Sequence, residues 1–151
     1  LAQFAGAAMP QVDVALEDHA TLMYTSGSTG HPKGALSSHR GVLSALYSWM
    51  CLSVANKIAG AAQLRNPGLA PAALVTIPLF HCTASHSVFL LSLVAGRKMV
   101  IMHKWDAEEA LRLIEAERIT WFNGVPTMSA ELQAAAAHTS RDISSLTEIM
   151  A

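Results

Sequence analysis

The stretch Tyr24–Gly34 has the sequence Tyr-Thr-Ser-Gly-Ser-Thr-Gly-His-Pro-Lys-Gly, and it decides how the rest of the chain is interpreted. It holds four aliphatic hydroxyl groups, three glycines and Lys33 within eleven residues. Glycines allow positive φ and a close approach of the backbone to a ligand, and successive turn amides form a concave set of donors for phosphate oxygens. The hydroxyls add small donors, and the lysine supplies a mobile positive charge for a polyphosphate. The stretch therefore predicts a phosphate-binding loop.

The spacing within this stretch excludes two common nucleotide-binding loops. A Walker A loop, G-x-x-x-x-G-K-[ST], needs a second glycine where Pro32 stands and a hydroxyl where Gly34 stands. A Rossmann G-x-G-x-x-G is excluded because no glycine lies two residues before Gly27. A solvated Gly/Ser-rich hairpin turn is the alternative. An ordinary turn, however, does not require so many hydroxyls followed by Pro-Lys-Gly.

The same stretch closely resembles the signature loop of the adenylate-forming superfamily, which includes acyl-CoA synthetases, luciferases and peptide-synthetase adenylation domains. Ser28 stands where the family usually has threonine, so the hydroxyl is kept. The resemblance implies that Lys33 assists the departure of pyrophosphate and that Thr29 is a local Mg²⁺ ligand. It also implies that the loop holds the β- and γ-phosphates of ATP through Thr25, Ser26, Gly27, Ser28, Thr29, Gly30 and Lys33.

A second segment, Pro78-Leu-Phe-His-Cys-Thr, follows an apolar run predicted to be a buried strand. His81 should therefore lie near the carboxyl end of a strand, where open α/β sheets bind ligands. From the spacing alone, a histidine satisfied at a helix N-terminus is the favoured interpretation. The segment is nevertheless similar to the family's second core motif, which implies that His81 lies by the acyl pocket. Ala84 stands where the family often has glycine, so the preferred chain length stays open.

A third segment, Ala107–Met128, also resembles the family, particularly its fatty-acid–CoA ligases. Within it, Gly-Val-Pro-Thr follows a predicted strand, and the resemblance implies that the acyl-binding region is lined by Gly124, Val125 and Pro126. The sequence holds no G-x-S-x-G nucleophile motif. Its histidines share no metal-ligand spacing. We therefore assign no catalytic triad and no zinc site.

The composition is apolar and weakly charged: 151 residues, 52% hydrophobic and 14% charged, with a net charge of −1. Charged residues typically make up about 25% of a globular domain. We therefore expect a piece of a larger protein, self-associating when alone, without a basic surface for nucleic acid. The longest apolar run, Val88–Ala95, is too short to span a bilayer. Cys51 and Cys82 lack paired spacing and are expected to be reduced core thiols of a cytoplasmic protein.

Apolar periodicity and turn residues predict that strands alternate with helices. Residues 1–18 have no clear period and are interpreted as a linker or lead-in. We expect strands at residues 20–25, 34–37, 72–77, 98–102, 119–122 and 146–150. We expect helices at residues 39–59, 85–95, from Asp106 onward, and 126–137. The first two strands should form a hairpin with the phosphate loop at its tip. The predicted fold class is α/β, a mostly parallel sheet with flanking helices.

The resemblance also implies a domain organisation and an activity. Residues 19–151 would form the central part of the AMP-binding (adenylation) domain, with the C-terminal part of the enzyme outside the chain. The parent protein would be an acyl-CoA synthetase that acts on a fatty or related carboxylic acid with ATP, Mg²⁺ and coenzyme A. The chain alone would be inactive. Two alternatives stay open: an adenylation domain that passes its acyl group to a carrier protein, and a nucleotide-binding or structural fragment without turnover.

Overall fold

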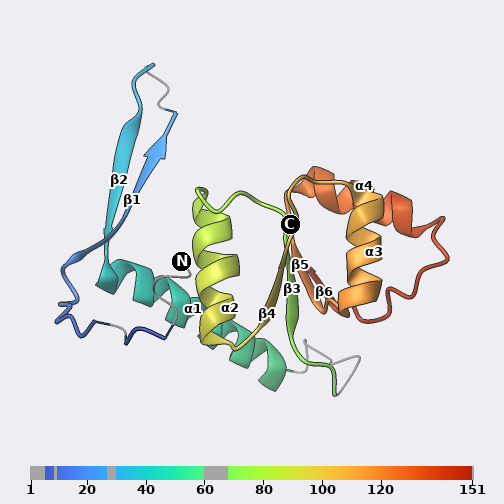
Figure 1. Ribbon diagram of the computed structural model, residues 1–151, viewed down its shortest axis with the longest axis horizontal. Helices are drawn as coiled ribbons and strands as arrows, with labels where there is room; N and C mark the ends of the chain where they lie inside the picture. Colours follow the sequence, from blue (N-terminus) through green and yellow to red (C-terminus); the bar gives the residue numbers. More distant parts are fainter. Residues whose placement is uncertain (1–5, 9, 27–29, 60–67, 151) are drawn as a thin grey trace. The chain divides into compact units, whose positions relative to one another are not determined.

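The computed structural model describes residues 6–8, 10–26, 30–59 and 68–150. The chain divides into two compact units, residues 1–43 and residues 44–151. The first unit carries a two-stranded hairpin, and the second carries a four-stranded sheet with helices (Figure 1).

The first unit is built on an antiparallel hairpin of β1 (His19–Thr25) and β2 (Lys33–Ser38). The pairing places Thr25 opposite Lys33 at the end that carries the loop. Both predicted strands are confirmed, and each begins one residue earlier than expected. Threonine, methionine and tyrosine in β1 suit an extended chain that pairs along its whole length.

The chain before β1 is tied to the start of helix α1 (His39–Ile58). Asp18 closes a turn, because its carboxylate accepts a hydrogen bond from the Ala15 N–H at 2.8 Å. The Asp18 carbonyl then accepts from the His39 N–H at 3.0 Å. Ser38 caps the helix as its position predicts, since its Oγ accepts from the Gly41 N–H at 3.3 Å. Among the described residues before β1 there is neither helix nor strand.

Helix α1 does not bury a single apolar stripe. Val42 and Leu46 are buried, whereas Leu43 is 37% and Val54 is 54% exposed. Apolar residues surround much of this helix, so their spacing alone does not select one buried face.

The second unit is built on a parallel sheet with the strand order β4-β3-β5-β6. Its strands in chain order are β3 (Ala72–Val75), β4 (Lys98–Ile101), β5 (Trp121–Asn123) and β6 (Glu148–Met150). The α/β fold class with a mostly parallel sheet is confirmed. The strands are shorter than the apolar runs that predicted them, because pairing between neighbours sets the ends of a strand.

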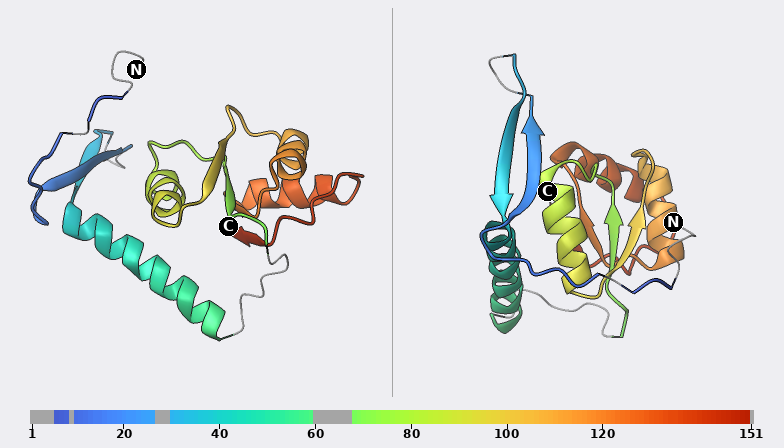
Figure 2. Two further views of the ribbon diagram at one scale, coloured as in Figure 1. Left: turned by 60° about the horizontal axis from the view of Figure 1, so that its bottom comes forward. Right: turned by 60° about the vertical axis from the view of Figure 1, so that its left-hand side comes forward.

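Helices cover both faces of this sheet (Figure 2). They are the π-helix η2 (Thr83–Leu90), its continuation α2 (Leu91–Val94), α3 (Ala107–Glu117) and α4 (Pro126–Ala136). The core on the α3–α4 side contains Ala72, Leu74, Met102, Ala110, Leu111, Ile114, Ile119, Phe122 and Leu132. The core on the η2 side contains Ala73, Val75, Val88 and Trp121. Successive residues of β3 alternate between the two cores, which explains why the strand is apolar throughout.

The helix expected from Ser85 begins earlier and has a different hydrogen-bond pattern. It starts at Thr83, and its first eight residues form a π-helix. Hydroxyl groups compete with the backbone here, because Ser85 Oγ donates to the His81 carbonyl at 3.1 Å and Ser87 Oγ donates to the Thr83 carbonyl at 2.6 Å. The spacing of apolar residues carries no information about these hydrogen bonds from hydroxyl groups to carbonyls. The sequence therefore predicted an ordinary α-helix.

The ends of the remaining helices follow local chemistry. The helix expected from Asp106 onward is confirmed, and Asp106 caps α3, since its Oδ1 accepts from the Glu109 N–H at 2.8 Å. Pro126 opens α4 as predicted, at the position where a missing N–H costs least. Gly96, with φ 61°, follows α2 in the left-handed conformation. Arg118 adopts φ 51° at the end of α3, a position usually filled by glycine or asparagine, and the sequence did not signal it.

The two cysteines are exposed, so the prediction of core thiols is wrong. Cys51 lies on α1, where an apolar neighbourhood in sequence does not specify a buried face. Cys82 lies in the turn before η2. Within the described residues, every helix is too short or too polar to cross a membrane.

Candidate functional site

The described ends of the predicted phosphate loop lie at the tip of the β1–β2 hairpin. Thr25 and Lys33 face each other there, and the Thr25 hydroxyl donates to the Lys33 carbonyl at 3.4 Å. Both residues are exposed, as are Ser26 and Gly30. Gly30 has φ 84°, a conformation that strains any residue with a side chain. The predicted loop residues Gly27, Ser28 and Thr29 lie outside the described residues.

Gly34 has a packing role at the base of this loop. A Cβ at this position would lie 2.8 Å from Leu22 Cδ1 and 3.6 Å from Tyr24 Cε1. A larger residue at this position would require the Leu22 side chain, which is 54% exposed, to move.

A second group of predicted residues lies where the central strands of the sheet end, which we call the carboxyl edge. Val75 pairs with Asn123, so the chain leaves β3 and β5 at the same level. Gly124 follows β5 and is buried, and its N–H donates to the Met150 carbonyl at 3.1 Å. Val125 is 44% exposed, and the chain turns into α4 at the next residue. The segment Gly124–Pro126 therefore lies at the edge where open α/β sheets bind ligands.

His81 lies in the turn between β3 and η2 and is exposed. Its N–H donates to the Pro78 carbonyl at 3.0 Å, and its carbonyl accepts from the Ser85 N–H at 3.0 Å. The ring nitrogen Nδ1 accepts from the Thr83 N–H at 3.2 Å. This bond requires Nδ1 to be unprotonated, so a neutral ring presents its proton on Nε2. His81 thus lies at the N-terminal end of a helix, and its Nε2 has no hydrogen-bond partner among the residues that the structure describes.

Two polar residues at the carboxyl edge were not singled out from the sequence. Thr76 follows β3 directly, and its hydroxyl approaches Met128 Sδ at 3.7 Å. Asn123 ends β5, one residue before Gly124. The available signal was a polar residue at the end of a buried apolar run, which is the usual position of ligand-contacting residues in such sheets.

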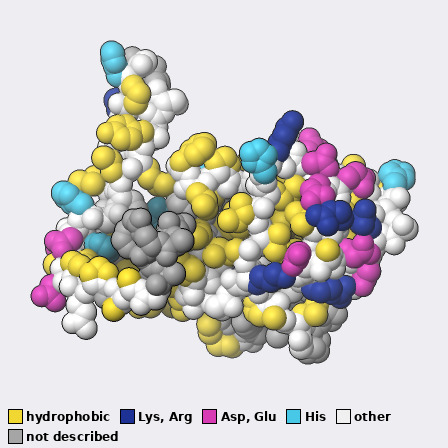
Figure 3. Space-filling view, viewed as in Figure 1, with side chains coloured by type: hydrophobic (Ala, Val, Ile, Leu, Met, Phe, Trp, Pro, Cys, Tyr) yellow, Lys and Arg dark blue, Asp and Glu magenta, His cyan; other side chains and the backbone are white. Residues whose placement is uncertain are grey.

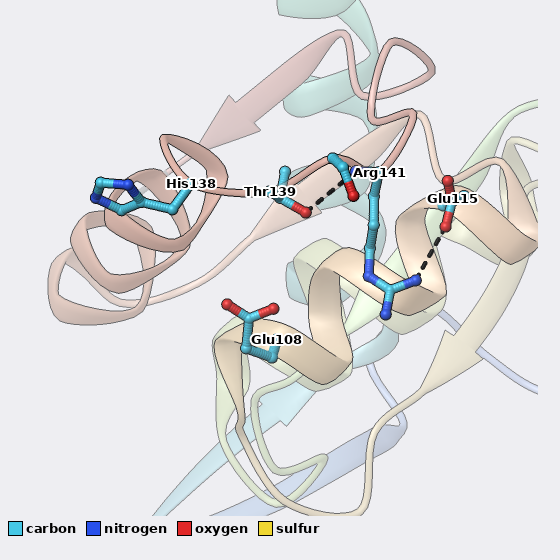
Figure 4. A pocket seen from close by; sticks show the side chains of 6 residues that line it. Glu108, Glu115, His138, Thr139 and Arg141 are labelled. Carbon is cyan, nitrogen blue, oxygen red and sulfur yellow. Dashed lines mark hydrogen bonds and ion pairs between the residues drawn. The ribbon is translucent and has the colours of Figure 1, made fainter.

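On the face drawn in Figure 3, acidic and basic side chains gather over α3 and the segment after α4. A polar hollow of about 380 Å³ lies there, lined by Glu108, Glu115, His138, Thr139, Ser140 and Arg141 (Figure 4). Arg141 Nη1 lies 3.0 Å from Glu115 Oε2, and the Asp142 N–H donates to Glu115 Oε1 at 2.8 Å. The Asp142 N–H, followed by Arg141, lowers the pKa of Glu115. The Glu115 carboxylate, the Arg141 guanidinium and the Asp142 N–H therefore satisfy one another. None of the predicted site residues lines the hollow.

Metal binding has no local candidate in the part of the chain that the structure describes. No group of three or more histidine, cysteine, aspartate or glutamate side chains there could hold an ion. The predicted Mg²⁺ ligand, Thr29, lies outside the described residues.

Comparison with known proteins identifies the family of this chain. A model described as AMP-binding enzyme matches residues 2–151. The chain belongs to the AMP-binding enzyme family. Feruloyl-CoA synthase from an Amycolatopsis species is 39% identical over 144 residues, which cover 93% of this chain and 26% of that protein. The 4-coumarate–CoA ligase 5 of Oryza sativa subsp. japonica is 35% identical over 152 residues, which cover 97% of this chain and 26% of that protein.

Solved structures of similar fold agree with the family. The inhibitor-bound N-terminal domain of FACL13 from Mycobacterium tuberculosis has a TM-score of 0.73 and 26% identity, over 98% of this chain and 35% of that chain. ATP-bound MatB from Rhodopseudomonas palustris has a TM-score of 0.72 and 25% identity, over 96% of this chain and 26% of that chain. The chain thus spans about a quarter of the length of the curated relatives named above. The predicted superfamily is confirmed.

Proposed function

We propose that the protein to which this chain belongs activates a carboxylic acid with ATP and transfers the acyl group to coenzyme A. One observation carries the proposal: a chain of this family contains the Tyr24–Gly34 stretch. The strands that flank this stretch form a hairpin in which Thr25 pairs with Lys33. The relatives named for feruloyl-CoA and 4-coumarate–CoA ligation support coenzyme A as the acceptor.

The reaction has two steps. A carboxylate oxygen attacks the α-phosphorus of ATP, an acyl–phosphate bond forms, and the bond to the β-phosphate breaks to release pyrophosphate. The thiol of coenzyme A then attacks the acyl carbon, and AMP leaves. Reactions at phosphorus depend mainly on positioning and on neutralisation of charge. The ammonium of Lys33, exposed at the hairpin tip, is suited to neutralise the departing pyrophosphate.

The phosphates would be held by the loop, through the hydroxyls and amides of Thr25–Gly30. Mg²⁺, with Thr29 as its protein ligand, would neutralise phosphate charge. Magnesium commonly takes few protein ligands and keeps water and phosphate oxygens, which is compatible with a single hydroxyl here.

The acid would be bound at the carboxyl edge by His81, Gly124, Val125 and Pro126. A fatty or related carboxylic acid is the class that we propose, and a structure named as a fatty acyl-CoA synthetase of Mycobacterium tuberculosis is among the similar folds. Among the related carboxylic acids, the names of the sequence relatives favour aromatic acids such as ferulate and 4-coumarate.

A pyrophosphate-exchange assay on the full-length protein tests this function. Ferulate, 4-coumarate and saturated fatty acids of several lengths would each be supplied with ATP. We expect acid-dependent exchange of labelled pyrophosphate into ATP, followed by thioester formation when coenzyme A is added. Exchange without thioester formation would favour transfer to a carrier protein. Absence of exchange with every acid would contradict the proposal.

A further inference from the structure

Gly124 is required by the space around it rather than by its backbone conformation. A Cβ at this position would lie 2.5 Å from Phe122 Cζ, 3.1 Å from Phe122 Cε1 and 3.3 Å from Met128 Cβ. Its φ is not among the positive values found for glycines in the described residues. The missing side chain therefore points at the ring of Phe122, in the α3–α4 core, and away from open space.

The ring that covers Gly124 is itself held in place. Phe122 is fully buried and stacks on Trp105, with 5.6 Å between ring centroids and an angle of 24° between the ring planes. Trp105 Nε1 donates to Glu131 Oε2 at 2.6 Å. Glu131 belongs to α4, the helix that begins two residues after Gly124. The indole thus joins the segment before α3 to both β5 and α4.

We infer that Trp105 and Phe122 are positioning residues for the acyl-binding segment Gly124–Pro126. The inference rests on the proposed function, in which this segment lines the acid site. The Phe122 ring stacks on the Trp105 indole and also lies against the position that a Gly124 side chain would occupy. Without the Trp105 indole, the Phe122 ring has room to move away from Gly124. The Gly124 backbone then loses its packing contact with that ring. Because the ring contacts Gly124 from the core, these residues act on acid binding without touching the acid.

This geometry predicts how a side chain at residue 124 acts. In Gly124→Ala the new methyl group must displace the Phe122 ring. In Phe122→Leu the shorter side chain leaves room for that methyl group. We therefore expect Gly124→Ala to lower the unfolding midpoint less in the Phe122→Leu background than in the wild type. Equal shifts in both backgrounds would overturn the assigned contact.

The main test uses Trp105→Leu and Trp105→Phe in the full-length protein. We expect Trp105→Leu to raise the KM for the acid about three- to tenfold and to leave the KM for ATP unchanged, because only acid binding depends on the segment. Trp105→Phe keeps an aromatic ring on Phe122 and should restore most of the acid KM. Trp121→Leu is the matched control, since Trp121 stands on the opposite face of the sheet, under the Arg97 guanidinium at 4.6 Å.

Hydrogen exchange of the peptide covering residues 122–128 supplies a readout that needs no turnover. Exchange in this peptide should be faster in Trp105→Leu than in the wild type and in Trp121→Leu. Unchanged exchange, or equal increases in the KM for acid and for ATP, would overturn the positioning role. If the wild type activates no acid, the proposed function fails, the acid-binding half of this inference fails with it, and hydrogen exchange still decides whether Trp105 positions the segment.

Discussion

Ala72 and Thr120 exchange hydrogen bonds at the start of the two central strands. The Ala72 N–H donates to Thr120 Oγ1 at 3.0 Å, and this hydroxyl donates to the Ala72 carbonyl at 3.1 Å. The Thr120 N–H donates to the same carbonyl at 2.9 Å. One threonine therefore satisfies both backbone groups of a residue that is only 2% exposed. The pair aligns β3 with β5, whose far ends form the carboxyl edge.

Thr120→Val should destabilise the protein because it leaves the buried Ala72 N–H without its side-chain acceptor. The expected loss is about 1–3 kcal/mol in the free energy of unfolding, the usual penalty for one unsatisfied buried group. Urea unfolding followed by circular dichroism measures it. Thr120→Ser, which keeps the hydroxyl, is the matched control and should lose less. Equal stability of the valine variant and the wild type would show that the hydroxyl bonds contribute nothing.

Pyrophosphate should bind at the hairpin tip. We expect the amide signals of Ser26, Gly30 and Lys33 to shift first when pyrophosphate is titrated into the protein and followed by NMR, because turn amides and a lysine suit phosphate oxygens. The hollow beside Arg141 is the internal comparison, since it also carries a cation. Larger shifts at residues 138–141 would place anion binding there and not at the hairpin.

Lys33→Ala should impair the first half-reaction of the full-length protein more than the second. Removal of a charge that faces the leaving group is expected to slow adenylate formation about tenfold or more. Thioester formation from supplied acyl-adenylate should change less, because pyrophosphate has already left. Pyrophosphate exchange and single-turnover thioester formation measure the two steps. Lys33→Arg keeps the charge as a control, and equal losses in both steps would contradict the role.

Asp142 should make the stability of the second unit depend on pH in acid. Hydrogen bonds from Ser144, followed by Arg118, lower the pKa of Asp142 from 3.8 to about 2. The folded pKa is depressed, so the stabilisation is present above the unfolded pKa and is lost as the pH falls through the folded value. The difference in unfolding free energy between the wild type and Asp142→Asn should therefore be constant above about pH 5 and shrink toward pH 2.

An NMR titration of the Asp142 carboxyl carbon checks the cause. Ser144→Ala removes the side-chain hydrogen bond from Ser144, which is the first cause of the lowered pKa, and should raise the pKa of Asp142 toward its ordinary value. Arg118→Gln removes a charge and should raise this pKa as well. A wild-type Asp142 that titrates at its ordinary value would refute the predicted pH dependence.

The 151-residue chain should self-associate through the apolar edges of its sheet. Ile101 on edge strand β4 is 63% exposed, and Ile149 on edge strand β6 is 55% exposed. Exposed edges and apolar patches favour pairing with another chain. Light scattering should show association that Ile149→Lys reduces, whereas Gln133→Lys, an equal change of charge on α4, should not. A monomeric wild type at high concentration would contradict this.

The sequence by itself determined the family, the hairpin of β1 and β2, and the alternation of strands and helices. Its signals were local: apolar runs long enough for strands, Asp106 three residues before Glu109, and Pro126 at a helix start. A cap or a turn forms between residues a few positions apart, so neighbouring side chains specify it. For this reason the strands and helices were predicted in the right order, several ends differ by one or two residues, and the π-helix Thr83–Leu90 was predicted as an ordinary α-helix.

Tertiary structure alone decided the strand order β4-β3-β5-β6, the exposure of the two cysteines and the surroundings of Gly124. The glycine was predicted at the acid site, but its contact with Phe122, and through it with Trp105, depends on how β5 and α4 pack. Which strand lies beside which, and which face of a helix is covered, follow from contacts between residues distant in sequence. An apolar periodicity in the sequence predicts that a helix or strand has an apolar face. Only the tertiary packing determines which residues that face contacts.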